Sequence, residues 1–252
     1  GMSLNGMSLN GMSLNGMSLN GMSLNSSELS GELASGEAVF GAGMVGAHLS
    51  GVLSDGSTLP LRIDSARTLP GPNGDVWAYG VSYALAGGSW APLCGVSGGA
   101  PVAAIALVGT WDLRSGVPGG GSWAASSSEF TFACRGAALA KCVELGYKPW
   151  QSVSGTLLRD HHQACARMIR ADYCGDGTAW TRDGELINLY DSLGIQEDAA
   201  NWKTDAEWLP GGARCYHKLR DFRHGKPHCK ELKSNHCGSF ADGALLIDEY
   251  KP

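Results

Sequence analysis

The eight cysteines are the residues whose type and number most directly indicate chemistry in this sequence. They are even in number, all of them follow residue 90, and no two form a Cys-x-x-Cys pair. This usage is typical of a disulfide framework made in an oxidising compartment. Many complete pairings are open to eight cysteines, so the spacing selects none of them. The disulfide candidates are Cys94, Cys134, Cys142, Cys165, Cys174, Cys215, Cys229 and Cys237.

A cysteine nucleophile is the first alternative use of these residues. On a helix, His161, His162 and Cys165 would lie on adjoining faces with Asp172 nearby, which is in principle a Cys-His-Asp set. The competing interpretation places Cys165 in a disulfide and the histidines in packing or surface roles. We favour the second interpretation because every cysteine has an available partner. The sequence therefore predicts no catalytic residue and no enzyme.

Metal binding is the second alternative. Cysteine and histidine are zinc ligands, and seven of them crowd between residues 215 and 237, but their spacing matches no standard zinc finger. Asp172, Asp176 and Asp183 lie around glycines, but without the EF-hand spacing of a calcium loop. Disulfides and turns explain both groups more simply, so we expect neither a metal nor another cofactor. The zinc candidates are Cys215, His217, His224, His228, Cys229, His236 and Cys237.

Aromatic side chains in the second half of the chain are candidate stacking platforms for sugars. Aromatic residues lie in the protein core more often than they bind ligands. A surface polysaccharide is therefore kept only as a secondary partner. The residues concerned are Tyr147, Trp150, Tyr173, Trp180, Tyr190, Trp202 and Trp208.

A five-residue repeat opens the chain. Gly-Met-Ser-Leu-Asn occurs five times without change over residues 1–25, and glycine keeps the same phase through Gly56 with one break at Ser26. Met and Leu are two residues apart, so an extended segment points both to one face. Stacked short strands would bury that face. The predicted repeat core is Met2, Leu4, Met7, Leu9, Met12, Leu14, Met17, Leu19, Met22 and Leu24.

This periodicity resembles the pentapeptide-repeat family, whose units carry a central Leu or Phe and close square coils. The resemblance implies a β-solenoid over residues 1–56. The chain departs from the family two positions before the central residue, where Met replaces a small side chain. A flexible low-complexity linker is the alternative. We favour the solenoid because Met and Leu at fixed phase are not typical of solvated linkers.

An uncapped solenoid has consequences for assembly. Its end presents unpaired backbone groups that can template another chain, and identical units allow a five-residue slip in register. Such a contact is heterologous and does not close, so it builds a filament. Copies of the same chain, joined head to tail through the repeat, are the expected partner.

A second resemblance concerns the cysteine-rich half. Ala171-Asp172-Tyr173-Cys174 is preceded by His162-Gln163-Ala164-Cys165 and followed by Gly175-Asp176-Gly177. Lys141-Cys142, the run from Gly146 to Trp150, Trp208, Gly212-Ala213 and Cys215 complete the pattern. These motifs resemble the ADYC domain family over about residues 130–240. The resemblance implies a secreted, cysteine-rich module, and it implies no reaction.

The remaining segments define the expected fold class, a β-rich α+β protein. Residues 1–56 form the solenoid, 57–125 a small antiparallel β-sheet unit, and 126–252 a disulfide-rich α+β module. In this module a strand leads into a helix over 130–147, a second helix spans 155–173, and a hairpin over 178–190 turns at Asp183-Gly184. Glycine is abundant at 37 residues and charge is sparse at 17%, which favours β-rich architecture.

Charge and hydropathy limit the partners and the location. The net charge of −5 gives no general attraction to nucleic acid. The longest apolar run, from Ala100 to Val108, is far shorter than the roughly 20 residues that a membrane span needs. Gly1 begins in repeat phase without an initiator Met, so we expect an upstream segment, and a removed signal peptide would agree with the cysteines. The predicted location is extracellular or at the cell surface.

The predicted function is that of an extracellular structural protein, the subunit of a surface filament that assembles through its repeat. Two alternatives stay open. One is a secreted adhesion or glycan-binding module displayed on a repeat stalk. The other is a secreted enzyme of unknown reaction, for which no sequence feature is compelling.

Overall fold

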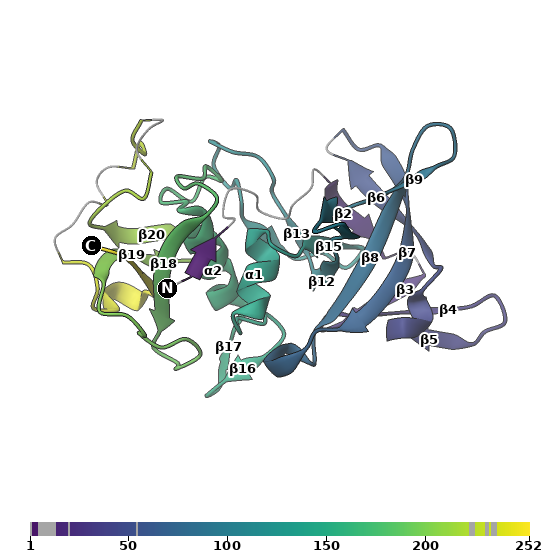
Figure 1. Ribbon diagram of the computed structural model, residues 1–252, viewed down its shortest axis with the longest axis horizontal. Helices are drawn as coiled ribbons and strands as arrows, with labels where there is room; N and C mark the ends of the chain where they lie inside the picture. Colours follow the sequence, from purple (N-terminus) through teal and green to yellow (C-terminus); the bar gives the residue numbers. More distant parts are fainter. Residues whose placement is uncertain are drawn as a thin grey trace. The chain divides into compact units, whose positions relative to one another are not determined.

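The structure is a computed structural model and describes residues 2–4, 14–19, 21–53, 55–221, 225–229, 232 and 236–252. The chain divides into two compact units (Figure 1). The cysteine-rich unit contains residues 1–9, 112–122 and 136–252. The barrel unit contains residues 10–111 and 123–135. Both units therefore draw on the expected segments 1–56 and 57–125.

The barrel unit is built on one antiparallel sheet that closes on itself. Its strand order is β12-β15-β2-β6-β7-β8-β9, and β8 also pairs with β12, which closes the ring and leaves β9 as an extension of β8. Closure removes open edges from a sheet. The strands are β2 (Leu14–Ser18), β6 (His48–Leu53), β7 (Thr58–Thr68), β8 (Trp77–Ala84), β9 (Trp90–Pro92), β12 (Ala104–Val108) and β15 (Glu129–Cys134).

Alternation of side chains fills the barrel interior. In β6, Leu49 and Gly51 are buried while His48 and Ser50 are exposed, as the two-residue period of a strand requires. Gly56 (φ +82°) makes the tight turn to β7, which a residue without Cβ adopts at no steric cost. The buried core is Met17, Leu29, Met44, Leu49, Leu61, Ile63, Tyr79, Val81, Ala104, Ala106, Phe130 and Phe132.

Smaller elements complete the barrel unit. A three-stranded antiparallel sheet has the order β3-β4-β5, and two pairs of short strands follow later in the chain. These elements are β3 (Met22–Asn25), β4 (Glu28–Glu32), β5 (Ala38–Phe40), η1 (Gly41–Met44), η2 (Gly71–Asn73), β10 (Val96–Ser97), β11 (Ala100–Pro101), β13 (Thr110–Trp111) and β14 (Trp123–Ala124).

The cysteine-rich unit packs helices on a second antiparallel sheet of order β1-β18-β21-β19-β20. Helix α2 contacts β19, β20 and β21, and α1 packs against α2. The strands are β1 (Met2–Leu4), β18 (Glu185–Asp191), β19 (Lys203–Leu209), β20 (Gly212–Tyr216) and β21 (Leu246–Tyr250). The other elements are α1 (Ala138–Glu144), α2 (Arg159–Arg170), β16 (Ser152–Val153), β17 (Thr156–Leu157) and η4 (Ala241–Gly243).

The local predictions for the module expected over residues 126–252 were partly right. The strand and helix expected over 130–147 are β15 and α1, and the second helix is present as α2. Only the second arm of the predicted hairpin is a strand. This strand, β18, begins directly after the turn at Asp183-Gly184, and residues 178–182 before the turn form no strand. Among the described residues, no helix is long and apolar enough to cross a membrane.

The predicted solenoid over residues 1–56 is wrong, and the structure gives no support to the resemblance to pentapeptide repeats. The repeat instead forms separate strands in separate ladders: β1 pairs with β18, β2 with β6 and β15, and β3 with β4. Side chains alternate every two residues along a strand whereas the repeat has an odd period, so consecutive copies in one extended chain would face opposite ways. Single copies that each pair with strands outside the five identical copies avoid that conflict.

The predicted repeat core is only partly tested. Met17 is fully buried, while Leu19, Met22 and Leu24 are half-buried and pack against the barrel core. Met7, Leu9 and Met12 lie outside the described residues, as do the side chains of Met2, Leu4 and Leu14.

Candidate functional site

All eight cysteines are in disulfides, so the expected framework is present. Cys94–Cys134 lies in the barrel unit, and the other three bridges lie in the cysteine-rich unit. Those three are Cys142–Cys165, Cys174–Cys229 and Cys215–Cys237.

The residues of the Cys-His-Asp hypothesis have structural roles. Cys165 is bonded to Cys142 and therefore offers no thiol. His162 is fully buried, its Nε2 lies 3.0 Å from the Leu139 carbonyl oxygen, and its Nδ1 lies 2.8 Å from an Arg159 nitrogen. Burial, reinforced by the Arg159 charge, lowers the pKa of His162 to about 3. The imidazole is therefore neutral at physiological pH and joins α2 to α1.

Two of the residues proposed as zinc ligands, Cys215 and Cys237, lie next to Glu207. Glu207 and the sulfurs of Cys215 and Cys237 cluster within 4.8 Å. The two sulfurs are bonded to each other, and a disulfide lacks the thiolate charge that zinc requires. The carboxylate of Glu207 is also occupied. Its Oε1 accepts backbone N–H groups of Gly238, Ser239 and Phe240 at 2.9, 2.5 and 2.8 Å, and its Oε2 accepts from Arg214.

Other members of these sets are held elsewhere or fall outside the described residues. Cys229 is bonded to Cys174, His217 accepts the backbone N–H of Cys237 at Nε2 (3.3 Å), and His228 lies 3.7 Å from Asp176. His224 is outside the described residues.

Asp172, the acid of the proposed nucleophile and calcium sets, anchors a buried ion pair. Its Oδ2 lies 2.5 Å from Arg167 Nη1 and accepts the Gly177 N–H at 2.9 Å, while Oδ1 accepts the Asp176 N–H at 3.1 Å. The same Arg167 nitrogen donates to the Gly120 carbonyl oxygen at 2.6 Å. Burial raises the pKa of Asp172, and Arg167 opposes that rise. This carboxylate therefore organises the turn that follows α2.

The other residues of the tetrapeptide, Ala171, Tyr173 and Cys174, also have structural roles. Ala171 (φ +51°) ends α2 in the left-handed conformation. The ring of Tyr173 packs against Trp208 with centroids 5.3 Å apart, and both side chains are fully buried. Cys174 ties the turn to Cys229. Every residue of the Ala-Asp-Tyr-Cys tetrapeptide thus contributes to a helix end, an ion pair, an aromatic core or a disulfide.

A second buried charge cluster lies beneath this turn. Arg220 donates to Asp248 at 2.8 Å and lies 3.4 Å from Asp205, and Asp248 also accepts the Trp208 indole N–H at 2.6 Å. All three charged side chains are buried. Burial and the adjacent Asp248 charge raise the pKa of Asp205 well above its usual value, against the effect of Arg220. One arginine is thus shared by two carboxyl groups, one of which retains its proton more readily.

Three of the seven aromatic candidates for sugar stacking are buried, and four are partly exposed. Tyr147, Tyr173 and Trp208 are fully buried, so they cannot stack on a sugar. Trp150, Trp180, Trp202 and Tyr190 are half-buried.

The feature that sequence reasoning missed is the position of β2 inside the barrel. This strand, Leu-Asn-Gly-Met-Ser from the repeat, lies between β15 and β6 and pairs antiparallel with both. Met17 is opposite Phe130 on one side and Gly51 on the other. The apolar alternation of the repeat predicts that it can form a strand. It does not predict which distant strand pairs with it.

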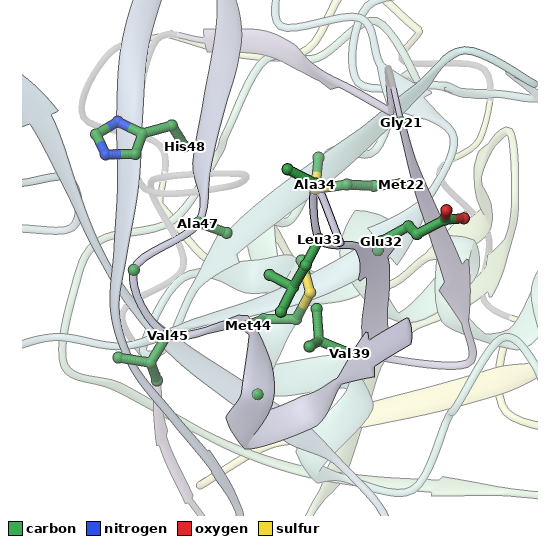
Figure 2. Close-up of a pocket in the computed structure, with 13 residues that line it drawn as sticks. Gly21, Met22, Glu32, Leu33, Ala34, Val39, Met44, Val45, Ala47 and His48 are labelled. Atoms are coloured by element: carbon green, nitrogen blue, oxygen red, sulfur yellow. The ribbon is translucent and has the colours of Figure 1, made fainter. Parts of the chain in front are cut away.

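The fifth repeat copy borders a pocket in the same unit. This pocket has a volume of about 530 Å³ and is lined by β3, the β4–β5 hairpin and the segment from η1 to β6. Figure 2 shows Leu33, Val39 and Met44 gathered in it, with Glu32 and His48 at opposite sides. Leu33 and Val45 are exposed, as is Phe40 on the nearby edge strand β5. Met22 thus connects the repeat to an exposed apolar surface.

Comparison with known proteins agrees with the tetrapeptide and its surroundings. The ADYC domain family matches residues 41–221, which is more than half of the chain. The chain belongs to the ADYC domain family. The match begins well before the expected residue 130 and includes most of the barrel unit. No curated protein and no solved structure matches the chain.

Proposed function

We propose that this chain is an extracellular structural protein that assembles with copies of itself through its five-residue repeat. The repeat acts as a set of strands that complete sheets, instead of as a stacked coil. The observation that carries the proposal is that three segments of one repeated sequence form strands with three unrelated sets of partners.

Identical segments with different partners favour exchange between chains. A β-ladder is formed by backbone groups, and its acceptor strand does not distinguish one repeat copy from another. Each chain carries more copies than a single ladder uses. A copy from a neighbouring chain can therefore take the same place as a copy from the chain itself, as in domain swapping.

The disulfides support an extracellular location. Four bridges of this kind persist in oxidising compartments and are rare where thiols are kept reduced. In this proposal the disulfides cross-link each chain internally, and the repeat joins one chain to the next.

Sedimentation velocity of the oxidised full-length chain over a range of concentrations tests this function. The weight-average mass should rise with concentration, and electron micrographs should show linear assemblies. The double variant Met7→Ser with Leu9→Ser removes the apolar groups of one copy that lies outside the described strands, and it should assemble less. A control variant, Val96→Ser with Leu157→Ser, removes two exposed apolar side chains elsewhere and should assemble like wild type.

A wild-type chain that stays monomeric at every concentration contradicts the proposal. That result, together with retention on a polysaccharide column, would favour the alternative of a secreted adhesion module.

A further inference from the structure

We infer that the gap between β15 and β6 is a strand-acceptor site, and that its occupant in an assembly is the Leu-Asn-Gly-Met-Ser strand of a second copy of this chain. This inference rests on the proposed function and specifies where the chains join. In the monomer the site is filled by residues 14–18 of the same chain.

The strand in this site is paired along both of its edges. On the β6 side, Leu14 is opposite Leu53 and Gly16 is opposite Val52. On the β15 side, Ser18 is opposite Glu129, and the adjoining Leu19 N–H donates to the Ser128 carbonyl oxygen at 2.8 Å. Withdrawing the strand would open the barrel and leave two unpaired edges, which readily accept another strand.

One side chain of the strand belongs to the core. Met17 is fully buried among the residues that fill the barrel, and Phe130 is its ladder neighbour on β15. Burial of a Met side chain contributes about 1.5–3 kcal/mol relative to exposure. An empty site would lose this contribution, so the site favours occupation by some strand with Met in this position.

Gly16, the residue before Met17, limits which sequences fit between β15 and β6. A Cβ atom on Gly16 would lie 3.0 Å from Thr110 Cγ2 and 3.3 Å from Glu129 Oε1, closer than ordinary van der Waals contact. The site therefore favours Gly before Met, because a larger residue would require the Thr110 and Glu129 side chains to shift. Leu-Asn-Gly-Met-Ser begins at Leu4, Leu9, Leu14 and Leu19, so each chain carries four consecutive copies of this sequence.

A strand from a second chain makes the same contacts in the site as the chain's own strand. The effective concentrations of the two strands therefore decide which of them occupies the site. The chain's own strand has the advantage of tethering, which corresponds to effective concentrations of roughly millimolar order for short linkers. A displaced strand is then free to enter the barrel of the next chain. Because donor and acceptor are different surfaces, the contact is heterologous and extends without closing.

Cross-linking within mixed assemblies tests the site. Unlabelled chains and chains labelled with heavy nitrogen are each produced with a photoreactive methionine analogue, mixed in equal amounts, assembled and irradiated. Cleavage after glutamate separates residues 1–28 from Met44 and releases a second peptide that starts at Phe130. In the oligomer fraction, about half of the cross-links between these two peptides should join a light and a heavy chain, as random strand exchange requires.

Oligomers whose cross-links all join peptides of the same isotope would overturn the inference while leaving the proposed function intact. Absence of oligomers would overturn both.

Competition with peptides gives a second measurement. Excess Leu-Asn-Gly-Met-Ser-Leu-Asn should reduce the oligomer fraction several-fold and should co-elute with the monomer. The same peptide with its Gly replaced by Val should have little effect, because the added side chain meets Thr110 and Glu129. A peptide of reversed sequence is the control for composition. Equal inhibition by all three peptides would contradict an acceptor site that favours Gly before Met.

Discussion

The two compact units bury their interiors with different chemistry. In the barrel unit the core is almost wholly aliphatic and aromatic, and the closed ladder supports one disulfide. In the cysteine-rich unit three disulfides accompany buried charges, with Arg167 paired to Asp172 and Arg220 shared between Asp205 and Asp248. The first unit depends on burial and closure, whereas the second depends on specific polar contacts that must all be made.

This difference explains which parts of the sequence are distinctive. An apolar barrel tolerates many residues of suitable size, so its sequence carries a weak pattern. A buried ion pair cannot lose one partner without leaving a charge unpaired, so its residues form a recognisable motif. The Ala-Asp-Tyr-Cys tetrapeptide is therefore a marker of structure in this chain, and the repeat is the candidate for function.

The largest expected effect is at the buried ion pair. Asp172→Asn removes the charge that neutralises Arg167 and should lower the free energy of unfolding by about 3–5 kcal/mol. Urea denaturation followed by tryptophan fluorescence measures this loss. Asp112→Asn, at the more exposed pair with Arg114, is the matched control and should cost less than about 1 kcal/mol. Similar losses in the two variants would mean that the cysteine-rich unit does not depend on its buried charges.

Disulfide removal compares the two units directly. Replacing Cys142 and Cys165 by Ala should cost about 2–4 kcal/mol through the added freedom of the unfolded chain. The same change at Cys94 and Cys134 should cost a similar amount on that ground alone. Thermal unfolding of both double variants gives the difference. Any excess loss for the first pair measures how far the short helix α1 depends on its bridge to α2.

Met17 tests the core of the barrel. Met17→Ala should lower the free energy of unfolding by about 2 kcal/mol, at the low end for buried Met, because a five-residue slip can bring another copy's Met into place. Met22→Ala, in the same repeat context but half-buried, should cost less. Chemical denaturation of both variants decides the point, and a cost of about 5 kcal/mol at Met17 would exclude such slippage.

The effect at His162 depends on pH. Its folded pKa of about 3 lies below the ordinary value of 6.5, so the unfolded chain binds a proton first as the solution is acidified. The contribution of the neutral imidazole to the free energy of unfolding is complete above pH 6.5. It is lost as the pH falls toward 3, at up to about 1.4 kcal/mol per pH unit. In His162→Gln this slope should be absent, whereas His48→Gln, at an exposed site, should retain it. Unfolding measured from pH 7 to pH 4 would contradict the assignment if His162→Gln kept the wild-type slope.

Local patterns predicted part of the cysteine-rich unit. Even cysteine number indicated the disulfides, and apolar periodicity indicated α1 and α2. These features depend on residues close together in the chain or on chemistry intrinsic to one residue type. The role of Tyr173 was not predictable, because its partner Trp208 comes from a distant segment. Arg167, which pairs with Asp172, likewise donates to the carbonyl oxygen of Gly120 from a distant segment.

The repeat was misinterpreted for a related reason. Its regularity predicted strands with Met and Leu on one face, and strands are what several copies form. The error lay in the partner, since stacking on neighbouring copies was expected and antiparallel pairing with β18, β6, β15 and β4 was found. A repeat specifies its own period but says nothing about unrelated strands that offer a better ladder.

By itself, the sequence determined the chemistry available to this protein. It contains eight cysteines that can form four disulfides, a tetrapeptide that marks the ADYC family, and a repeated Gly-Met-Ser-Leu-Asn segment. Only the tertiary structure decided how these pieces are used. It paired the cysteines, buried the tetrapeptide around an ion pair, and placed one repeat strand between β15 and β6. The physical reason is that β-ladders, buried charges and disulfides join residues far apart in the chain, and a linear pattern contains no record of that proximity.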